Sequence, residues 1–171
     1  MTVRPPIAIR PERAEDADAI RKLLDAAFGG PMEAGLVDRL RAGGHLVRAQ
    51  VAVEGTAIVG YIAWPRLALE TASGSQPAVA LAPLAVTPPR QSQGIGSALV
   101  EAGLAQLRAG GETIVFVLGQ PDYYRRFGFS QETARAYDSI YAGAHFMALK
   151  LGPGAPENGR VRYPAPFDSL G

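Results

Sequence analysis

The feature that most constrains this chain is an abrupt change of pattern between Leu81 and Leu99, where the sequence reads LAPLAVTPPRQSQGIGSAL. An apolar run typical of a buried strand ends at Thr87-Pro88-Pro89, a polar turn follows, and a helical pattern begins near Gly94. The first amides of a helix have no intrahelical partner, and the helix dipole places partial positive charge there. This strand, turn and helix therefore predict a site for phosphate or pyrophosphate.

The turn itself reads Gln91-Ser92-Gln93-Gly94-Ile95-Gly96, a Q-x-x-G-x-G pattern. Gly94 and Gly96 carry no Cβ, so the backbone at both positions can approach an anion closely. Two other phosphate loops do not fit. A P-loop needs a Gly-Lys pair, which this sequence lacks, and a dinucleotide fingerprint needs a glycine or alanine where Leu99 stands. An ordinary strand-to-helix turn and an unrelated nucleotide-phosphate binder remain as alternatives at this point.

A second informative segment, residues 116–129, reads FVLGQPDYYRRFGF. The apolar run 114–118 is typical of a buried strand, and Pro121 suits the first turn of a helix. Gly128 is placed to end that short helix in a left-handed conformation. The segment thus predicts a strand followed by one short helix that carries Tyr123 and Tyr124.

Together the two segments resemble the GNAT superfamily of acyl-CoA-dependent N-acyltransferases. The first is similar to the family's [QR]-x-x-G-x-[GA] motif after a strand, and the second to its Y-x-x-x-G-F element. The whole pattern looks specifically like the YhbS-like group of predicted acetyltransferases, over roughly residues 7–151.

The resemblance implies an α/β (α+β) fold, with a mixed, mostly antiparallel central sheet that is splayed at strands 4 and 5 and has helices on both faces. Residues 1–151 would form the GNAT domain, and residues 152–171 a C-terminal extension packed on it. Acetyl-CoA would be the cosubstrate, with its pyrophosphate held by the amides of Gln91, Ser92, Gln93, Gly94, Ile95, Gly96 and Ser97. The expected reaction moves the acetyl group to a primary amine of a small molecule or peptide within a ternary complex.

Pro83 interrupts the apolar run that leads into the turn. Proline removes a ladder donor and is confined to sheet edges or bulges, so it predicts a bulge or a local separation of strands. In the resembling family, the pantetheine arm enters such a gap. The backbones of Leu84, Ala85 and Val86 would then pair with its amides. The alternative is a strand that simply starts at Leu84.

The same resemblance suggests residues for the chemistry. A backbone N–H near Val86 would stabilise the oxygen that becomes negative during attack on the thioester. Tyr124 matches the family's tyrosine and would protonate the leaving thiolate, whereas Tyr123 is expected to be structural. Glu33 follows the helix break at residues 29–31, where the family's first helices border the acceptor, and is the candidate general base. A core tyrosine at position 124 and a solvated acid at position 33 are the alternatives.

Composition narrows the remaining possibilities. The absence of cysteine among the 171 residues removes a cysteine nucleophile and any metal site with cysteine ligands. The net charge of +1 argues against a nucleic-acid-binding surface. With no long apolar run and no signal-peptide pattern, we expect no membrane segment and a cytoplasmic protein, as a monomer or homodimer. An inactive acyl-CoA-binding sensor of the same fold is the alternative to an enzyme.

Periodicity predicts the other elements. The apolar patterns indicate strands over residues 7–10, 46–53, 58–64, 79–86 and 146–151, and helices over residues 13–28, 33–41 and 94–108. Residues 73–77 are expected to be a polar connection, and the residues after Gly152 to wrap around the surface.

Overall fold

One long strand, β3 (Ala57–Thr71), organises the sheet of the computed structural model, which describes residues 4–170. Along one edge β3 pairs first with β2 (Leu46–Glu54) and further on with β9 (Gly159–Arg162). Along the other edge it pairs first with β5 (Leu84–Val86) and further on with β4 (Gly74–Leu81). A strand longer than any of its partners therefore joins the two ends of the sheet.

The remaining strands extend this arrangement on both sides. Next to β2 lies β1, and beyond β4 follow β6 and β8, while β7 pairs with β9. Within residues 4–170, the β4–β6 and β7–β9 pairs are parallel, and the other strand pairs are antiparallel. Their bounds are β1 (Ile7–Pro11), β6 (Ile114–Leu118), β7 (Tyr137–Asp138) and β8 (Phe146–Lys150). The expected mixed, mostly antiparallel sheet is confirmed.

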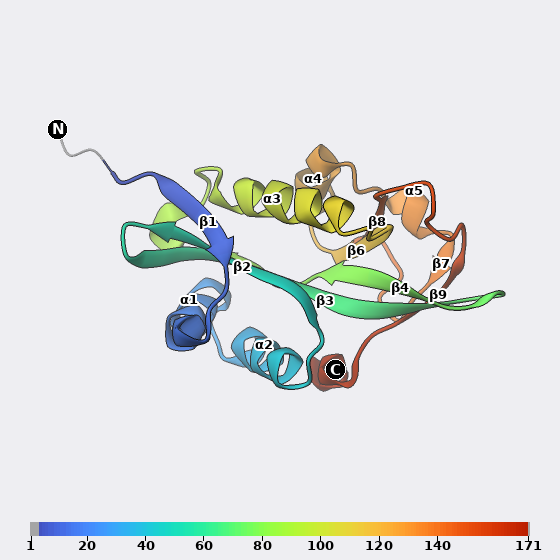
Figure 1. The fold of residues 1–171 in the computed structure, drawn as a ribbon, viewed down its shortest axis with the longest axis horizontal. Coiled ribbons are helices and arrows are strands. Elements are labelled where there is room, and N and C mark those ends of the chain that lie inside the picture. The colour runs from blue at the N-terminus through green and yellow to red at the C-terminus, as the bar shows by residue number, and fades with distance from the viewer. Residues whose placement is uncertain (1–3, 171) are drawn as a thin grey trace.

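Helices cover both faces of the sheet (Figure 1). One face carries α3 (Ile95–Ala109), and the other carries α1 (Ala17–Phe28) and α2 (Met32–Ala42). Successive strand residues point to opposite faces. Trp64 is accordingly buried in the core beneath α3, whereas Tyr61 is buried beneath α1 and α2. No helix within residues 4–170 is long and apolar enough to cross a membrane.

Two short helices, α4 (Pro121–Tyr124) and α5 (Gln131–Ala134), follow β6. A 3-10 turn extends α4 and ends at Gly128, whose φ of 99° is the left-handed conformation expected from the sequence. The predicted start of the first helix at residue 13 is wrong in detail. Residues Ala14–Asp16 form a 3-10 turn, and the α-helix begins at Ala17.

The predicted single strand over residues 79–86 is wrong, because the chain changes partner at Pro83. β4 ends at Leu81 and pairs with β6, whereas β5 begins at Leu84 and pairs with the other half of β3. Ala82 N donates to Ala63 O, which leaves Pro83 to accept from Ala63 N, both at 3.1 Å. Two residues thus oppose one, which is a bulge. The expected separation of strands at Pro83 is confirmed.

The expected polar connection over residues 73–77 is also wrong. β3 continues past Trp64 to Thr71, and β4 starts at Gly74, so this segment is the tip of a long hairpin. The strand predicted over residues 58–64 is therefore too short, because β3 runs through Pro65. This proline is tolerated because the pairing with β2 ends at Pro65, beside an irregularity in that ladder.

The C-terminal residues, expected to wrap around the surface as an extension packed on the domain, also add a strand and a 3-10 helix. Within residues 152–170, β9 pairs with both β3 and β7. The 3-10 helix Ala165–Leu170 then places Phe167 against Leu36 and Leu40 of α2. This segment therefore builds part of the same core that holds α2.

The packing of Gly103 on Trp64 yields a stability prediction. A Cβ added at Gly103 would overlap the indole, which is fully buried and has no room to move. Alanine gains about 1 kcal/mol over glycine in an open helix position, but overpacking a core costs about 1–3 kcal/mol. We expect Gly103→Ala to lower the free energy of unfolding, measured in urea.

Gly35 in α2 is the matched control for this variant. A Cβ at Gly35 would meet only the end of the flexible Arg39 side chain, at 3.3 Å. Gly35→Ala should therefore leave stability unchanged or raise it. Equal behaviour of the two variants would contradict the packing argument.

Candidate functional site

The glycine turn forms a cradle of backbone amides at the start of α3. Gly94 is the N-cap residue, with φ of 86°, and Ser92 precedes it with φ of 63°. The first intrahelical bond runs from Ala98 N to Gly94 O, at 3.0 Å. The N–H groups of Ile95, Gly96 and Ser97 therefore have no intrahelical acceptor and supply the positive end of the helix.

A cavity of about 550 Å³ lies against this cradle. Gly96 forms part of its wall, and a Cβ there would lie 3.1 Å from the Tyr123 hydroxyl. The cavity is lined by residues from four segments: Ala27 and Phe28, then Leu84, Ala85 and Val86, then Gln91, Ser92, Gly94, Gly96 and Ser97, and finally Tyr123 and Arg126. The structure thus brings the predicted loop together with β5, while Gln93 and Ile95 lie outside the lining, and Ile95 is buried.

Tyr123 and Arg126 also line this cavity, although the sequence analysis assigned neither of them to the site. The Tyr123 hydroxyl lies 3.2 Å from Ser97 Oγ, and the Arg126 guanidinium stacks over the Tyr123 ring at 4.7 Å. Arg125 points elsewhere, toward Asp122 at 3.2 Å. Residues three apart share a helix face, so the spacing of Tyr123 and Arg126 was the available signal. Arg126 adds a full positive charge to the amide cradle.

The register of β5 on β3 decides which backbone groups of β5 face the gap that separates β5 from β6. Thr87 N donates to Val59 O at 2.8 Å, and Pro83 O accepts from Ala63 N. Since hydrogen-bonding direction alternates along a strand, Ala85 also faces β3, whereas Leu84 and Val86 face away from it. The Gln91 side chain donates to Val86 O at 3.0 Å. The groups turned to the gap and not engaged by these bonds are the Val86 N–H and both polar groups of Leu84.

A second cavity, of about 400 Å³, lies on the side of α2 and holds both predicted catalytic residues, Tyr124 and Glu33. It shares Phe28 and Leu84 with the cradle cavity, so the two spaces adjoin. Burial raises the pKa of Tyr124 well above its ordinary value. The Tyr124 ring packs edge-on against Phe129, with ring centres 5.9 Å apart, and keeps its proton at neutral pH.

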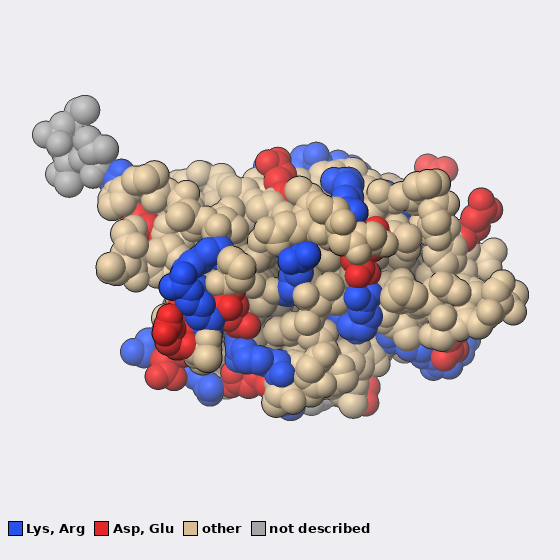
Figure 2. Space-filling view, in the orientation of Figure 1, with Lys and Arg blue, Asp and Glu red and all other residues tan. Residues whose placement is uncertain are grey.

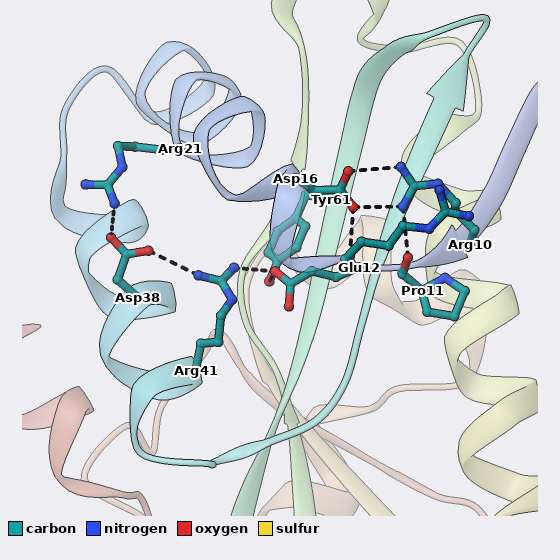
Figure 3. Close-up of polar contacts among 9 residues, drawn as sticks. Arg10, Pro11, Glu12, Asp16, Arg21, Asp38, Arg41 and Tyr61 are labelled. Carbon is teal, nitrogen blue, oxygen red and sulfur yellow. Dashed lines mark hydrogen bonds and ion pairs between the residues drawn. The ribbon is translucent and has the colours of Figure 1, made fainter.

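Ion pairs attach α2, and with it Glu33, to the rest of the molecule (Figure 3). Arg41 of α2 donates to Glu12, which also accepts from the Tyr61 hydroxyl at 3.2 Å. Asp38 pairs with Arg41 at 3.1 Å and with Arg21 of α1 at 2.6 Å. Burial raises the pKa of Tyr61, so Tyr61 stays a hydrogen-bond donor.

A separate pair fixes the start of α1. Arg10 binds Asp16 through both guanidinium nitrogens, at 2.7 and 3.0 Å, and Arg13 N donates to the same carboxylate at 2.8 Å. These bonds hold the pKa of Asp16 below its ordinary value. Figure 2 shows acidic and basic side chains interspersed over α1 and α2, where these pairs lie. No three His, Asp or Glu side chains within residues 4–170 are grouped to hold a metal ion.

A splayed sheet with an amide cradle beside the splay is the architecture of CoA-dependent acyltransferases of the GNAT type. Residues 8–131 match the family model of the acetyltransferase (GNAT) domain, and the chain belongs to this family.

Curated relatives place it near the YhbS group, as the sequence resemblance predicted. The chain is 38% identical to the uncharacterized N-acetyltransferase YjhQ of Escherichia coli K12 over 117 residues, 67% of this chain and 64% of YjhQ. It is 37% identical to YhbS of the same organism over 122 residues, 71% of this chain and 72% of YhbS. The match thus spans slightly less than two thirds of YjhQ.

Solved structures agree. E. coli YhbS, determined in complex with CoA, superposes with a TM-score of 0.88 at 30% identity, over 100% of this chain and 97% of YhbS. A GNAT family acetyltransferase from Brucella melitensis, in complex with acetyl-CoA, gives 0.81 at 37% identity, over 95% and 99% of the two chains. The expected GNAT fold is confirmed.

The Glu12–Arg41 pair yields a second stability prediction. Arg41→Ala leaves the Glu12 carboxylate, which is 13% exposed, without its charged partner. Because Arg41 is itself 31% exposed, we expect a loss of about 2–3 kcal/mol, somewhat below the cost of breaking a fully buried pair. Adding Glu12→Gln should restore part of that loss, which a double-mutant cycle in urea measures.

The exposed pair Glu70–Arg162 is the control for this cycle, since its side chains are 51% and 54% exposed. Solvent and salt screen such a pair, so its two substitutions should be additive. Equal coupling energies for the two pairs would show that Glu12 and Arg41 do not hold α2.

Proposed function

We propose that this protein transfers the acetyl group of acetyl-CoA to a primary amine by direct attack within a ternary complex. The observation that carries the proposal is the pair of adjoining cavities. One lies on an amide cradle with Arg126 beside it, and the other holds Tyr124 and Glu33. The splay at Pro83 lies where the two meet, next to Leu84.

The residues at the cradle fit a diphosphate. The amides of Ile95, Gly96 and Ser97 and the Arg126 guanidinium supply the donors, and the absence of a Cβ at Gly96 keeps the surface open. At the gap, Leu84 and Val86 offer backbone groups with the alternation of a strand edge, which suits the two amides of a pantetheine arm. Ala85 contributes to the lining but turns its backbone toward β3.

Transfer forms a C–N bond to the thioester carbonyl carbon and breaks the C–S bond. The amine supplies the electron pair and loses a proton, and the departing sulfur gains one, so the products are an amide and free CoA thiol. The Val86 N–H faces the gap and is the donor proposed to stabilise the carbonyl oxygen as it becomes negative. One such preorganised donor contributes about 3–4 kcal/mol.

Tyr124 is the proposed acid and Glu33 the proposed base. Tyr124 keeps its proton because burial raises its pKa, so it can donate to the sulfur as the C–S bond breaks. Glu33 lines the same cavity and receives the proton released by the amine. The sequence contains no cysteine, so no cysteinyl acyl-enzyme is available, which supports direct transfer.

The proposed role of the cradle in CoA binding is tested by placing a side chain in it. Gly96→Val adds side-chain bulk next to the Tyr123 hydroxyl, and we expect it to raise the Kd for CoA at least about tenfold, which corresponds to about 1.4 kcal/mol. Isothermal calorimetry measures the Kd, and thermal unfolding shows whether the variant folds. An unchanged Kd in a folded variant would place the diphosphate elsewhere.

Two alanine variants at glycines of positive φ separate the effect of backbone strain from the effect on CoA binding. Gly94→Ala and Gly44→Ala both place a Cβ at positive φ, 86° and 71°, in open space. Both should lower stability, but only the change at Gly94 should weaken CoA binding.

The acid is tested by removing one hydroxyl. Tyr124→Phe should lower the single-turnover rate of transfer by about a hundredfold, the lower range for general acid catalysis. The Kd for CoA should change little, because Tyr124 does not line the cradle cavity. Tyr123→Phe is the matched control: it loses the contact with Ser97 and should affect CoA binding more than the rate.

Two results would contradict this assignment. A single-turnover rate unchanged by Tyr124→Phe would remove this hydroxyl from the mechanism. Tight CoA binding without release of free CoA thiol, across a broad panel of amines, would instead favour an acyl-CoA sensor.

A further inference from the structure

The cavity that holds Tyr124 and Glu33 has an unusual wall. Among its described lining residues, Glu33 is the only charged one. The rest of the wall is built mainly of leucine, alanine, proline, phenylalanine and tyrosine side chains, including Tyr141, Tyr163 and Phe167 from the C-terminal part of the chain. A cavity of about 400 Å³ with one charged anchor and a largely apolar wall is typical of a small-molecule site.

Exposed apolar side chains mark the rim of this cavity. Phe28 and Leu118 are 45% and 52% exposed, although both are large and apolar, and both line it. Met32, next to Glu33 in the chain, is 56% exposed. Large apolar groups that stay in water beside a cavity indicate contact with a ligand. Phe28 also lines the cradle cavity, so the rim lies between the two spaces.

The single charge in the wall discriminates among classes of amine. A polyamine or an aminoglycoside carries several positive charges, and one carboxylate can neutralise only one of them, leaving the others against an apolar wall. A free amino acid would bring its carboxylate into a lining that contains no Lys or Arg among the described residues. A single ammonium on an apolar body matches both the one charge and the wall.

We propose that the acetyl acceptor is a small monoamine with an alkyl or aryl body, its ammonium held by Glu33 and its body packed between Phe28, Leu118 and Tyr163. This inference rests on the proposed function and names the substrate class of the same site. Glu33 therefore selects the positive charge and takes one proton from the ammonium, which frees the nitrogen lone pair for attack. The second proton leaves the nitrogen as the C–N bond forms and replaces the one that Tyr124 gives to the sulfur.

The test is a homologous series of amines. With the protein saturated with CoA, which prevents turnover, the Kd values of propylamine, butylamine, pentylamine and hexylamine are measured by calorimetry. Each buried methylene contributes about 0.8 kcal/mol, so the Kd should fall about fourfold per carbon. Spermidine and glycinamide should bind at least about tenfold more weakly than hexylamine. With acetyl-CoA, KM should follow the same order.

Matched variants locate the amine. Glu33→Gln should raise the Kd of hexylamine at least about tenfold, whereas Glu101→Gln, on the exposed side of α3, should not change it. Leu118→Lys places a positive charge at the rim and should also weaken hexylamine. Ile140→Lys is its control, because Ile140 is 79% exposed and does not line this cavity.

The possible outcomes distinguish a failure of the proposed acceptor class from a failure of the proposed function on which it rests. If CoA itself fails to bind, the proposed function fails. If CoA binds and spermidine, glycinamide or a lysine-containing peptide is acetylated in preference to hexylamine, only the acceptor class is overturned. A Kd independent of alkyl length overturns it as well. Tighter binding of octanoyl-CoA than acetyl-CoA, with hexylamine competing, would assign the cavity to a long acyl chain and overturn it too.

Discussion

The site depends on one change of partner along β3. Two residues, Ala82 and Pro83, stand opposite Ala63, and this bulge shifts the register so that β5 continues along β3 while β4 stays beside β6. Proline cannot donate to Ala63 O, and Ala82 does so in its place. The separation of β5 from β6 therefore costs no hydrogen bond to β3, yet it turns the backbone of Leu84 and Val86 toward a gap.

The two faces of the sheet support different parts of the proposed site, the cradle on one face and Glu33 on the other. Beneath α3, the packing of Trp64 and Leu99 fixes the helix whose first amides form the cradle. On the opposite face, α2 carries Glu33, and its attachment combines an apolar seam with the half-buried ion pair of Arg41 and Glu12. A charge network is costly to bury unless each member is paired. Tyr61 and Asp38 provide those further partners, so α2 is held in one position relative to the splay.

The amide cradle was predictable from sequence because it is local. Glycines at fixed spacing and a helix start lie within a few residues of one another, so the sequence places Gly94, Gly96 and Ser97 in one turn without tertiary information, and all three line the cradle cavity. Tyr123 was missed, because only the fold brings its hydroxyl to Ser97 across 26 positions. The second half of β3 was not predicted, for a similar reason. Proline is typical of a strand end, and Pro65 is tolerated within β3 only because the partner strand β2 stops there. The direction of the Ala85 backbone likewise depends on register, which a bulge alters.

The proposed acceptor cavity draws on a part of the chain beyond the residues that the family model matches. The GNAT model covers residues 8–131, whereas Tyr141, Tyr163 and Phe167 of the cavity wall lie beyond it. Phe167 reaches that wall because β9 pairs with β3 and the following 3-10 helix packs on Leu36 and Leu40. The family model therefore covers the cradle directly but does not extend to these side chains. The acceptor must be argued from the wall itself, where one carboxylate stands among aromatic and aliphatic groups, and a fold shared by many acetyltransferases leaves that question to each chain.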